Sequence, residues 1–286
     1  MSEHYCRGSE WRRWELHLHT PNTKKNDQYQ GRDENEKWDN FYRSIKDYVG
    51  DGEDPLKAIC AIAITDYLSI DNYIKVRNDN CLPDCVKRLL PNVELRMKPI
   101  GQEAPLNIHC IFSPDIVNQI NDRFFSKLKF RFHDNDYGAS YSELVRLGRA
   151  YDDENNLSET QAYQTGLNQY VISYDMLAEI FTSNKDLKNN TIIIVSNKNN
   201  DGASGIVTHS GYFEGTTSQL DATRQQIYQL ADMIFSSSSS DIKYFLGKKA
   251  DNTETVIRKC GSLMPCVHGC DAHTNVDIFE PSEKRY

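Results

Sequence analysis

Two histidines separated by a single residue, His17 and His19, lie in the segment Trp-Glu-Leu-His-Leu-His-Thr at 14–20. The segment has the pattern of a β-strand, in which alternate residues share a face, so both imidazoles would lie on one side. Leu16 and Leu18 would then point together to the other face, toward a core. Two imidazoles at a strand end can bind one metal ion from the same direction, which indicates hydrolytic metal chemistry. A hydrogen-bonded polar pair is the alternative, so the residues downstream decide.

Further candidate ligands follow apolar, strand-like runs along the chain: Asp66, Glu94, His109, Asp271 and His273. Histidine and carboxylate ligands suit zinc, manganese or iron better than calcium. We expect one or two divalent ions (Mn, Zn, Fe or Mg). A carboxylate such as Glu94 can bridge two ions, and a hydroxide between them would attack phosphorus in line.

The candidate catalytic residues are Glu94, Asp271 and Asp66, with Asp66 expected to orient a ligand histidine from behind. Other interpretations stay open for each residue type. A carboxylate can instead be satisfied by backbone amides or an arginine, and His109 could be a hydrogen-bonded core histidine. His273 could donate to a substrate phosphate rather than bind metal. The flanking basic residues Arg12, Arg13, Lys24 and Lys25 could contact phosphate or be simply solvated.

These residues need elements that bring them together. The pattern predicts strands at 13–19, 60–66, 92–97, 106–112, 191–196, 232–236 and 264–269, and helices at 37–49, 70–77, 141–151 and 218–231. Alternation of strands and helices favours a parallel sheet. The candidate ligands fall at or beyond strand ends, as an α/β TIM-like barrel active site requires.

The segment 115–190 is long, polar and mostly helical in pattern. We expect a helical insertion between adjacent barrel strands, within a single domain that spans 1–286. The segment His133-Asp134-Asn135-Asp136 carries metal-like residues, but dense polar loops often look this way. His209 follows a strand-like run, on a loop that could overhang the site.

Composition narrows the class of protein. The chain has 286 residues, 38% of them hydrophobic, and a formal net charge of −8. This charge opposes a free-standing binder of nucleic-acid backbone, but not a nuclease, because bound cations supply local positive charge. Several of the eight cysteines lie in apolar runs and no signal peptide is visible, so we expect a cytoplasmic protein. No apolar run approaches membrane-spanning length.

Five short motifs occur in the order seen in PHP (polymerase and histidinol phosphatase) domains: His-Leu-His-Thr at 17–20, Ile-Thr-Asp at 64–66, Val-Glu-Leu at 93–95, Asn-Ile-His at 107–109 and Gly-Cys-Asp-Ala-His at 269–273. The chain most resembles the PHP module of TrlF-type proteins, in the segments 11–20, 64–73, 200–205 and 226–247. Those proteins join the module to an AAA/SMC-like ATPase. The resemblance spans nearly the whole chain and implies a distorted seven-stranded (β/α) barrel.

The resemblance also implies a distribution of metal ligands. His17, His19, Glu94 and Asp271 would bind one ion, Glu94 and His109 a second, and His273 a third. This chain departs from the family where histidine is common: it has Tyr67 after Asp66, Pro21-Asn22-Thr23 after the first motif, and Asn197 after the fifth strand. Cys270 replaces a usual serine. A third ion is therefore expected to be absent or weakly bound, and Asn197 or Asp201 is the candidate to complete the second.

The leading hypothesis is a metal-dependent phosphoesterase, a nuclease that hydrolyses phosphodiesters through a metal-activated water. The resemblance implies a nucleic-acid substrate, an AAA/SMC-like ATPase in cis or in trans, a role in antiphage defence and no membrane partner. One alternative is a phosphomonoesterase acting on a small metabolite. Another is a catalytically degenerate PHP module that binds a partner, because histidines are missing. Metal content separates an enzyme from a scaffold.

Overall fold

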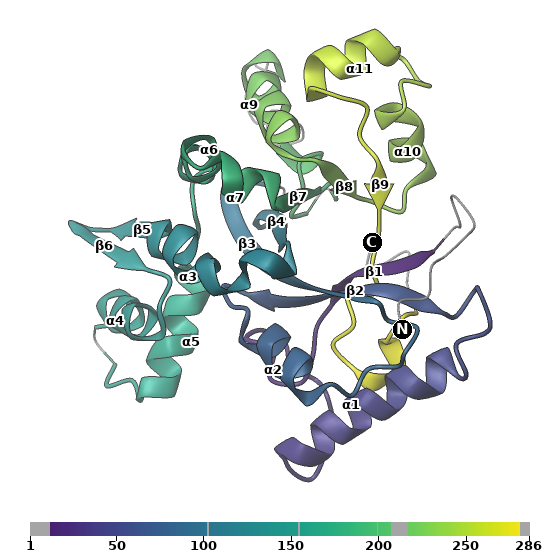
Figure 1. Ribbon diagram of the computed structural model, residues 1–286. Coiled ribbons are helices and arrows are strands. Elements are labelled where there is room, and N and C mark those ends of the chain that lie inside the picture. The colour runs from purple at the N-terminus through teal and green to yellow at the C-terminus, as the bar shows by residue number, and fades with distance from the viewer. Residues whose placement is uncertain (1–11, 102, 154, 199, 207–216, 281–286) are drawn as a thin grey trace.

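A seven-stranded sheet organises the protein. The computed structural model describes residues 12–101, 103–153, 155–198, 200–206 and 217–280. The strands follow one another in space as β1 (Arg13–Leu18), β2 (Ile59–Tyr67), β3 (Arg88–Ile100), β4 (Pro105–Phe112), β7 (Thr191–Ser196), β8 (Met233–Phe235) and β9 (Cys266–Val267) (Figure 1). Each predicted strand is present, although several of them begin or end a few residues away from the predicted limits.

The sheet is not parallel throughout. β1, β2 and β3 are parallel, and so are β7, β8 and β9, but β4 runs antiparallel to both of its neighbours. Only the short connection 101–104 joins β3 to β4, whereas a parallel crossover needs a dozen or more residues. The expectation of a parallel sheet is therefore wrong at β4, although His109 on this strand pairs with Glu94 on β3.

The two edges of the sheet meet and nearly close it into a barrel. Leu18 in β1 forms a parallel bridge with Ala272, just beyond β9. The amide of Asp271 donates to the carbonyl of His17 at 2.8 Å. The Tyr29 hydroxyl lies 2.8 Å from the carbonyl of His19 and 3.3 Å from that of Ala272. The first strand and the last segment of the barrel are thus held together at the site.

Helices cover the outside of the sheet. They include α1 (Glu34–Val49), α2 (Asp71–Asp79), α9 (Thr217–Leu230), α10 (Ser239–Phe245) and α11 (Thr253–Cys260). Figure 1 shows α1 beside the C-terminal segment that holds the turn η4 (Asn275–Asp277). The Asp33 side chain caps α1, and an apolar stripe at helical spacing (Trp38, Phe41, Tyr42, Ile45, Val49) is buried. No helix of the described residues is both long and apolar enough to cross a membrane.

The chain between β4 and β7 packs at one side of the sheet (Figure 1) and consists of η1 (Pro114–Gln119), α3 (Ile120–Arg123), η2 (Phe125–Lys127), β5 (Lys129–Phe132), β6 (Asn135–Gly138), α4 (Tyr141–Tyr151), α5 (Glu159–Gln169), α6 (Tyr174–Ser183) and α7 (Lys185–Asn189). β4 and β7 are neighbours, so this group is inserted between adjacent strands. It is not wholly helical, because β5 and β6 form a hairpin. His133 and Asp134 form its exposed turn.

Two apolar clusters lie on either side of the sheet. The larger contains Leu18 and the helix residues, whereas a small one joins Leu16 to Ala63, Ile111, Ile194 and Phe235, from five different strands. The expectation that Leu16 and Leu18 share one face is therefore wrong. β1 has a register shift between Glu15 and Leu18, and this irregularity turns neighbouring side chains to different sides.

Candidate metal centre

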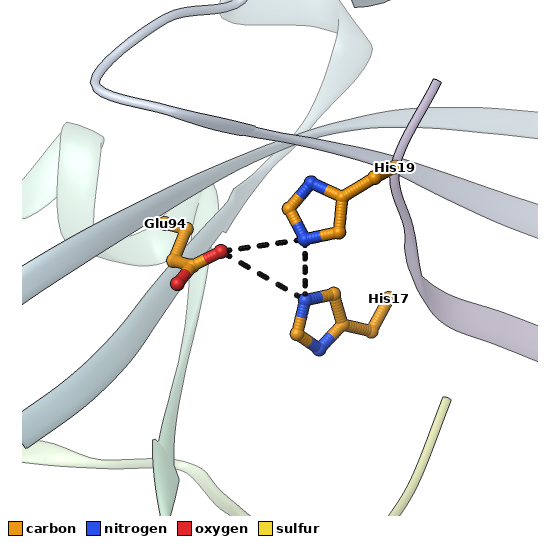
Figure 2. Close-up of side chains that lie close together, drawn as sticks. All are labelled: His17, His19 and Glu94. Atoms are coloured by element: carbon orange, nitrogen blue, oxygen red, sulfur yellow. Dashed lines mark hydrogen bonds and ion pairs between the residues drawn. The ribbon is translucent and has the colours of Figure 1, made fainter. Parts of the chain in front are cut away.

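Four of the candidate ligands converge at the end of β1. The Nε2 atoms of His17 and His19 lie 3.0 Å apart, and both side chains are buried. Glu94 projects from β3, with Oε2 3.4 Å from His19 Nε2 and 3.9 Å from His17 Nε2 (Figure 2). Asp271 places Oδ1 3.2 Å from His17 Nε2 and 3.5 Å from His19 Nε2. These four side chains come from both ends of the sequence and from its middle, and they face one point.

The spacing of these atoms fits one small cation. Ligands at about 2.0–2.2 Å from a tetrahedral ion lie roughly 3.3–3.6 Å from one another. The two imidazole nitrogens lie 3.0 Å from each other and 3.2–3.9 Å from the two carboxylate oxygens, and these separations bracket this range. Two imidazole nitrogens with two carboxylate oxygens suit zinc, manganese or iron. The cluster therefore has the donors and the geometry of a divalent metal site.

His273 lies on the outer side of this cluster. Its ring stacks on that of His19, with centroids 4.2 Å apart and planes at 18°. His273 Nε2 is 3.7 Å from Asp271 Oδ1, and the trio of His19, Asp271 and His273 offers ligand atoms that all lie within 4.8 Å of one another. His273 is thus placed to bind the same ion or a group that approaches it.

His109 lies at the buried side of the cluster, on the antiparallel strand β4. Its ring centroid is 4.4 Å from that of His17. The Asn92 amide nitrogen donates to Leu16 O and Thr65 Oγ1, so Asn92 Oδ1 must accept from His109 Nδ1 at 3.2 Å. The neutral ring then keeps its lone pair on Nε2, which is buried and has no hydrogen-bond partner among the described residues. His109 is in the protonation state that a metal ligand needs.

Asp66 stands behind the cluster rather than in it. Its carboxylate accepts from the amides of Lys24 and Tyr67 and from the side chains of Thr23 and Asn72. Because Thr23 Oγ1 donates to Asp66, it must accept from His19 Nδ1, 3.1 Å away. Asp66 therefore fixes the tautomer of His19 through Thr23, which leaves His19 Nε2 free to coordinate.

The surroundings of the site set the charges of its members. Burial alone would raise the pKa of Glu94, but Arg96, His109 and His19 outweigh it and hold the pKa at about 2. Burial lowers the pKa of His109 and that of His273 to about 4, and burial with neighbouring histidines holds the pKa of His17 well below its usual range. For His19, Asp271 and Glu94 outweigh burial and raise the pKa. An ionised Glu94 beside neutral His17 and His109 is suited to coordination, whereas the carboxylates beside His19 favour its protonated form.

Tyr67, which stands where a histidine is common, and Asn197 and Asp201, which were proposed to complete the second position, are engaged elsewhere. The Tyr67 hydroxyl donates to Tyr170 O at 2.9 Å. The amide of Asn197 donates to Asp241 and accepts from the Tyr228 hydroxyl. Asp201 pairs with Arg96 at 3.1 Å.

The basic residues that flank the first motif make different contacts. Arg13 donates to Tyr48 and to the carbonyls of Leu56 and Phe279, so it links β1 to three neighbouring segments. Lys24 pairs with Asp71 at 3.5 Å, and the Lys25 ammonium lies 4.3 Å from the centre of the Tyr67 ring. Arg12 is exposed. His209 lies outside the described residues.

A buried carboxylate that was not predicted from the sequence, Glu15, connects the backbone segments on either side of the site. Glu15 is 4% exposed and accepts from the amides of His17 and Cys270 at 2.9–3.1 Å. A Cβ atom on Gly269 would lie 2.5 Å from Glu15 Oε1, so only glycine allows this approach. The Cys270 thiol is fully buried and contacts the carbonyl of His17, where it packs as a small apolar group.

Comparison with known proteins gives little beyond this geometry. No protein-family model and no curated protein matches the chain. Among solved structures, the chain is similar to a provisionally assigned metal-dependent phosphoesterase from Bifidobacterium adolescentis ATCC 15703, with 11% identity and a TM-score of 0.35 over 92% of this chain and 88% of the other. A TM-score this low establishes neither a shared fold nor a shared activity.

Proposed function

We propose that this protein is a metal-dependent phosphoesterase of the PHP type and that it hydrolyses phosphodiesters in nucleic acid. The convergence of His17, His19, Glu94 and Asp271 on one point carries the proposal. The order of the short motifs along the chain supports the PHP assignment. The choice of nucleic acid as substrate follows from the resemblance to TrlF-type proteins.

Each residue of the site has its own role in the proposed hydrolysis. His17, His19, Glu94 and Asp271 would hold a divalent cation, which supplies Lewis acidity and acidifies a water molecule. Asp66 and Thr23 keep His19 in its coordinating tautomer. His273, less buried than His17 and His19, is the imidazole placed to donate to a phosphate oxygen or to take up a proton at the mouth of the site.

A second candidate is hydrolysis of a phosphomonoester on a small metabolite. It is favoured by the cations beside the cluster, because a terminal phosphate carries more charge than a diester. The Arg96 guanidinium is 3.2 Å from Glu94, and Lys25 is half-buried over Tyr67 nearby.

The proposed partner is an AAA/SMC-like ATPase module, in cis or in trans, and the proposed setting is defence against phage. Only the resemblance supports these two proposals. Such a partner would bring nucleic acid to a domain whose own net charge is −8.

One assay tests the proposed function and ranks the substrates. Purified protein is incubated with Mn, Mg or Zn and with plasmid, single-stranded DNA, RNA, a chromogenic phosphodiester and a chromogenic phosphomonoester. We expect metal-dependent cleavage of nucleic acid and the diester, and none by a His17→Ala/His19→Ala double variant. Cleavage of the monoester alone would support the second candidate. Protein that binds no metal and cleaves nothing would contradict both.

A further inference from the structure

The two oxygens of Glu94 face different partners. Oε2 points to His17 and His19, whereas Oε1 lies 3.2 Å from Nη2 of Arg96. Glu94 and Arg96 are two residues apart on β3 and therefore share its face. A carboxylate that bridges two ions with one oxygen on each uses both oxygens, but here a guanidinium already lies against one of them.

Arg96 is held in this position from its other side. Nη1 of Arg96 is 3.1 Å from Asp201 Oδ2. Asp201 is itself fixed, because its carbonyl accepts from the amide of Asn107 at 2.7 Å. Asn107 pairs directly with Arg96 in the β3–β4 ladder, as His109 does with Glu94. The guanidinium is thus a permanent positive charge built into the sheet beside the cluster.

We propose that Arg96 takes the place of a second metal ion: the centre binds a single divalent cation, and the guanidinium supplies the second positive charge and binds a phosphoryl oxygen of the substrate. The inference rests on the proposed function and deepens it. A cation between Glu94 Oε1 and His109 would have to lie against the guanidinium, which repels it. Neither Tyr67 nor Asn197 offers compensation, because both bond elsewhere.

Arg96 retains the capacity to bind phosphate. A guanidinium has five N–H donors in a planar fork. Its two terminal nitrogens each contact one carboxylate, and the side chain is 24% exposed. A fork that is oriented by carboxylates and reaches solvent is suited to a phosphate oxygen. The phosphate would then lie between the metal and Arg96, with its charge shared by both.

Two measurements on the full chain test this inference without turnover. Elemental analysis and native mass spectrometry of Mn-loaded protein should give one ion per chain. Calorimetric titration with inorganic phosphate should show affinity weakened about tenfold or more in Arg96→Gln, and by a few-fold in Arg96→Lys, which keeps the charge but loses the fork. Arg88→Gln, an exposed arginine on the same strand, should match the wild type.

The outcomes separate this inference from the proposed function. Two or more ions in the wild type, or unchanged phosphate affinity in Arg96→Gln, overturns the role of Arg96 while metal-dependent cleavage can stand. A wild type without metal removes the proposed function itself. If Arg96→Gln fails to fold by circular dichroism, the wild-type metal count and the phosphate affinity of Arg96→Lys decide, and unchanged affinity in Arg96→Lys overturns the inference.

Discussion

Glu15 and Cys270 join the first strand to the last segment of the barrel: both carboxylate oxygens of Glu15 lie within 3.0–3.1 Å of the Cys270 amide. The next residue, Asp271, has a left-handed backbone (φ 48°) and turns its carboxylate toward the histidines. Since Glu15 also accepts from the amide of His17, one side chain sets the backbone on both sides of the proposed metal.

Glu15→Ala should destabilise the protein and loosen the metal. It leaves two buried amides without an acceptor, which costs roughly 2–4 kcal/mol of the free energy of unfolding. Metal affinity should fall as well, because His17 and Asp271 lose their relative position. Thermal unfolding and metal titration measure the two effects. Glu179→Ala, an exposed glutamate in α6, is the control; an equal effect at both positions would contradict the role of Glu15.

The contribution of Glu15 should depend on pH. Burial raises its pKa from an ordinary 4.5 to about 7. The folded state therefore holds a proton that the unfolded state releases between these values, so this stabilisation is present below pH 4.5 and lost as pH rises through 7. In chelator-treated protein, the stability deficit of Glu15→Gln relative to wild type should shrink from pH 5 to pH 8, by up to a few kcal/mol. A deficit that grows over this interval would show the sign to be wrong.

Thr23→Val should weaken metal binding without unfolding the protein. The substitution keeps the shape but removes the hydroxyl between His19 and Asp66, so the His19 tautomer is no longer fixed. Loss of such outer partners lowers metal affinity about 10–100-fold. Competition with a chromogenic chelator measures it. Thr182→Val, at an exposed position of α6, should bind metal as the wild type does.

Glu94→Gln should reduce hydrolysis about 100-fold or more, equivalent to about 2.7 kcal/mol of transition-state stabilisation. The variant keeps the size of the side chain but removes the negative charge that holds the cation and pairs with Arg96. Initial rates at saturating metal provide the measurement. His133→Ala, in the exposed turn between β5 and β6, should retain wild-type activity. A larger loss at His133 would place the site elsewhere.

Removal of metal should lower the melting temperature by several degrees. A ligand present at a thousand times its Kd stabilises the folded state by about 4 kcal/mol. Differential scanning fluorimetry with and without EDTA gives the shift. The His17→Ala/His19→Ala double variant should show no shift, whereas His133→Ala should shift as the wild type does. Identical curves for wild type with and without EDTA would argue against bound metal.

The arrangement of most strands and the convergence of the acids and histidines followed from sequence, because strand ends in an α/β barrel meet at one place. The positions of Glu15 and Arg96 on their strands were also visible in the sequence. Glu15 has the same strand parity as His17 and His19, and Arg96 the same parity as Glu94. Their roles were missed because their partners, Cys270 and Asp201, lie far away along the chain.

Other features depended on the length of a loop, on very short strands or on a side-chain contact, none of which the local hydrophobic pattern reveals. The antiparallel direction of β4 is set by the four-residue link at 101–104, although the strand itself has the same apolar pattern as a parallel one. The β5–β6 hairpin was hidden because its strands have only four residues each. In the sequence, Thr23 stands out only because it lies in a stretch where the family commonly has a histidine. In the structure, its hydroxyl connects His19 to Asp66.

Closure of the barrel by its first and last segments also determines when the site can form. His17 and Asp271 lie in the first and last strand segments of the barrel, so no fragment that lacks residues 266–273 contains the complete cluster. Contacts this distant in sequence form late and slow the search for the native state. The proposed metal can therefore find its complete set of ligands only after residues 266–273 have docked against β1.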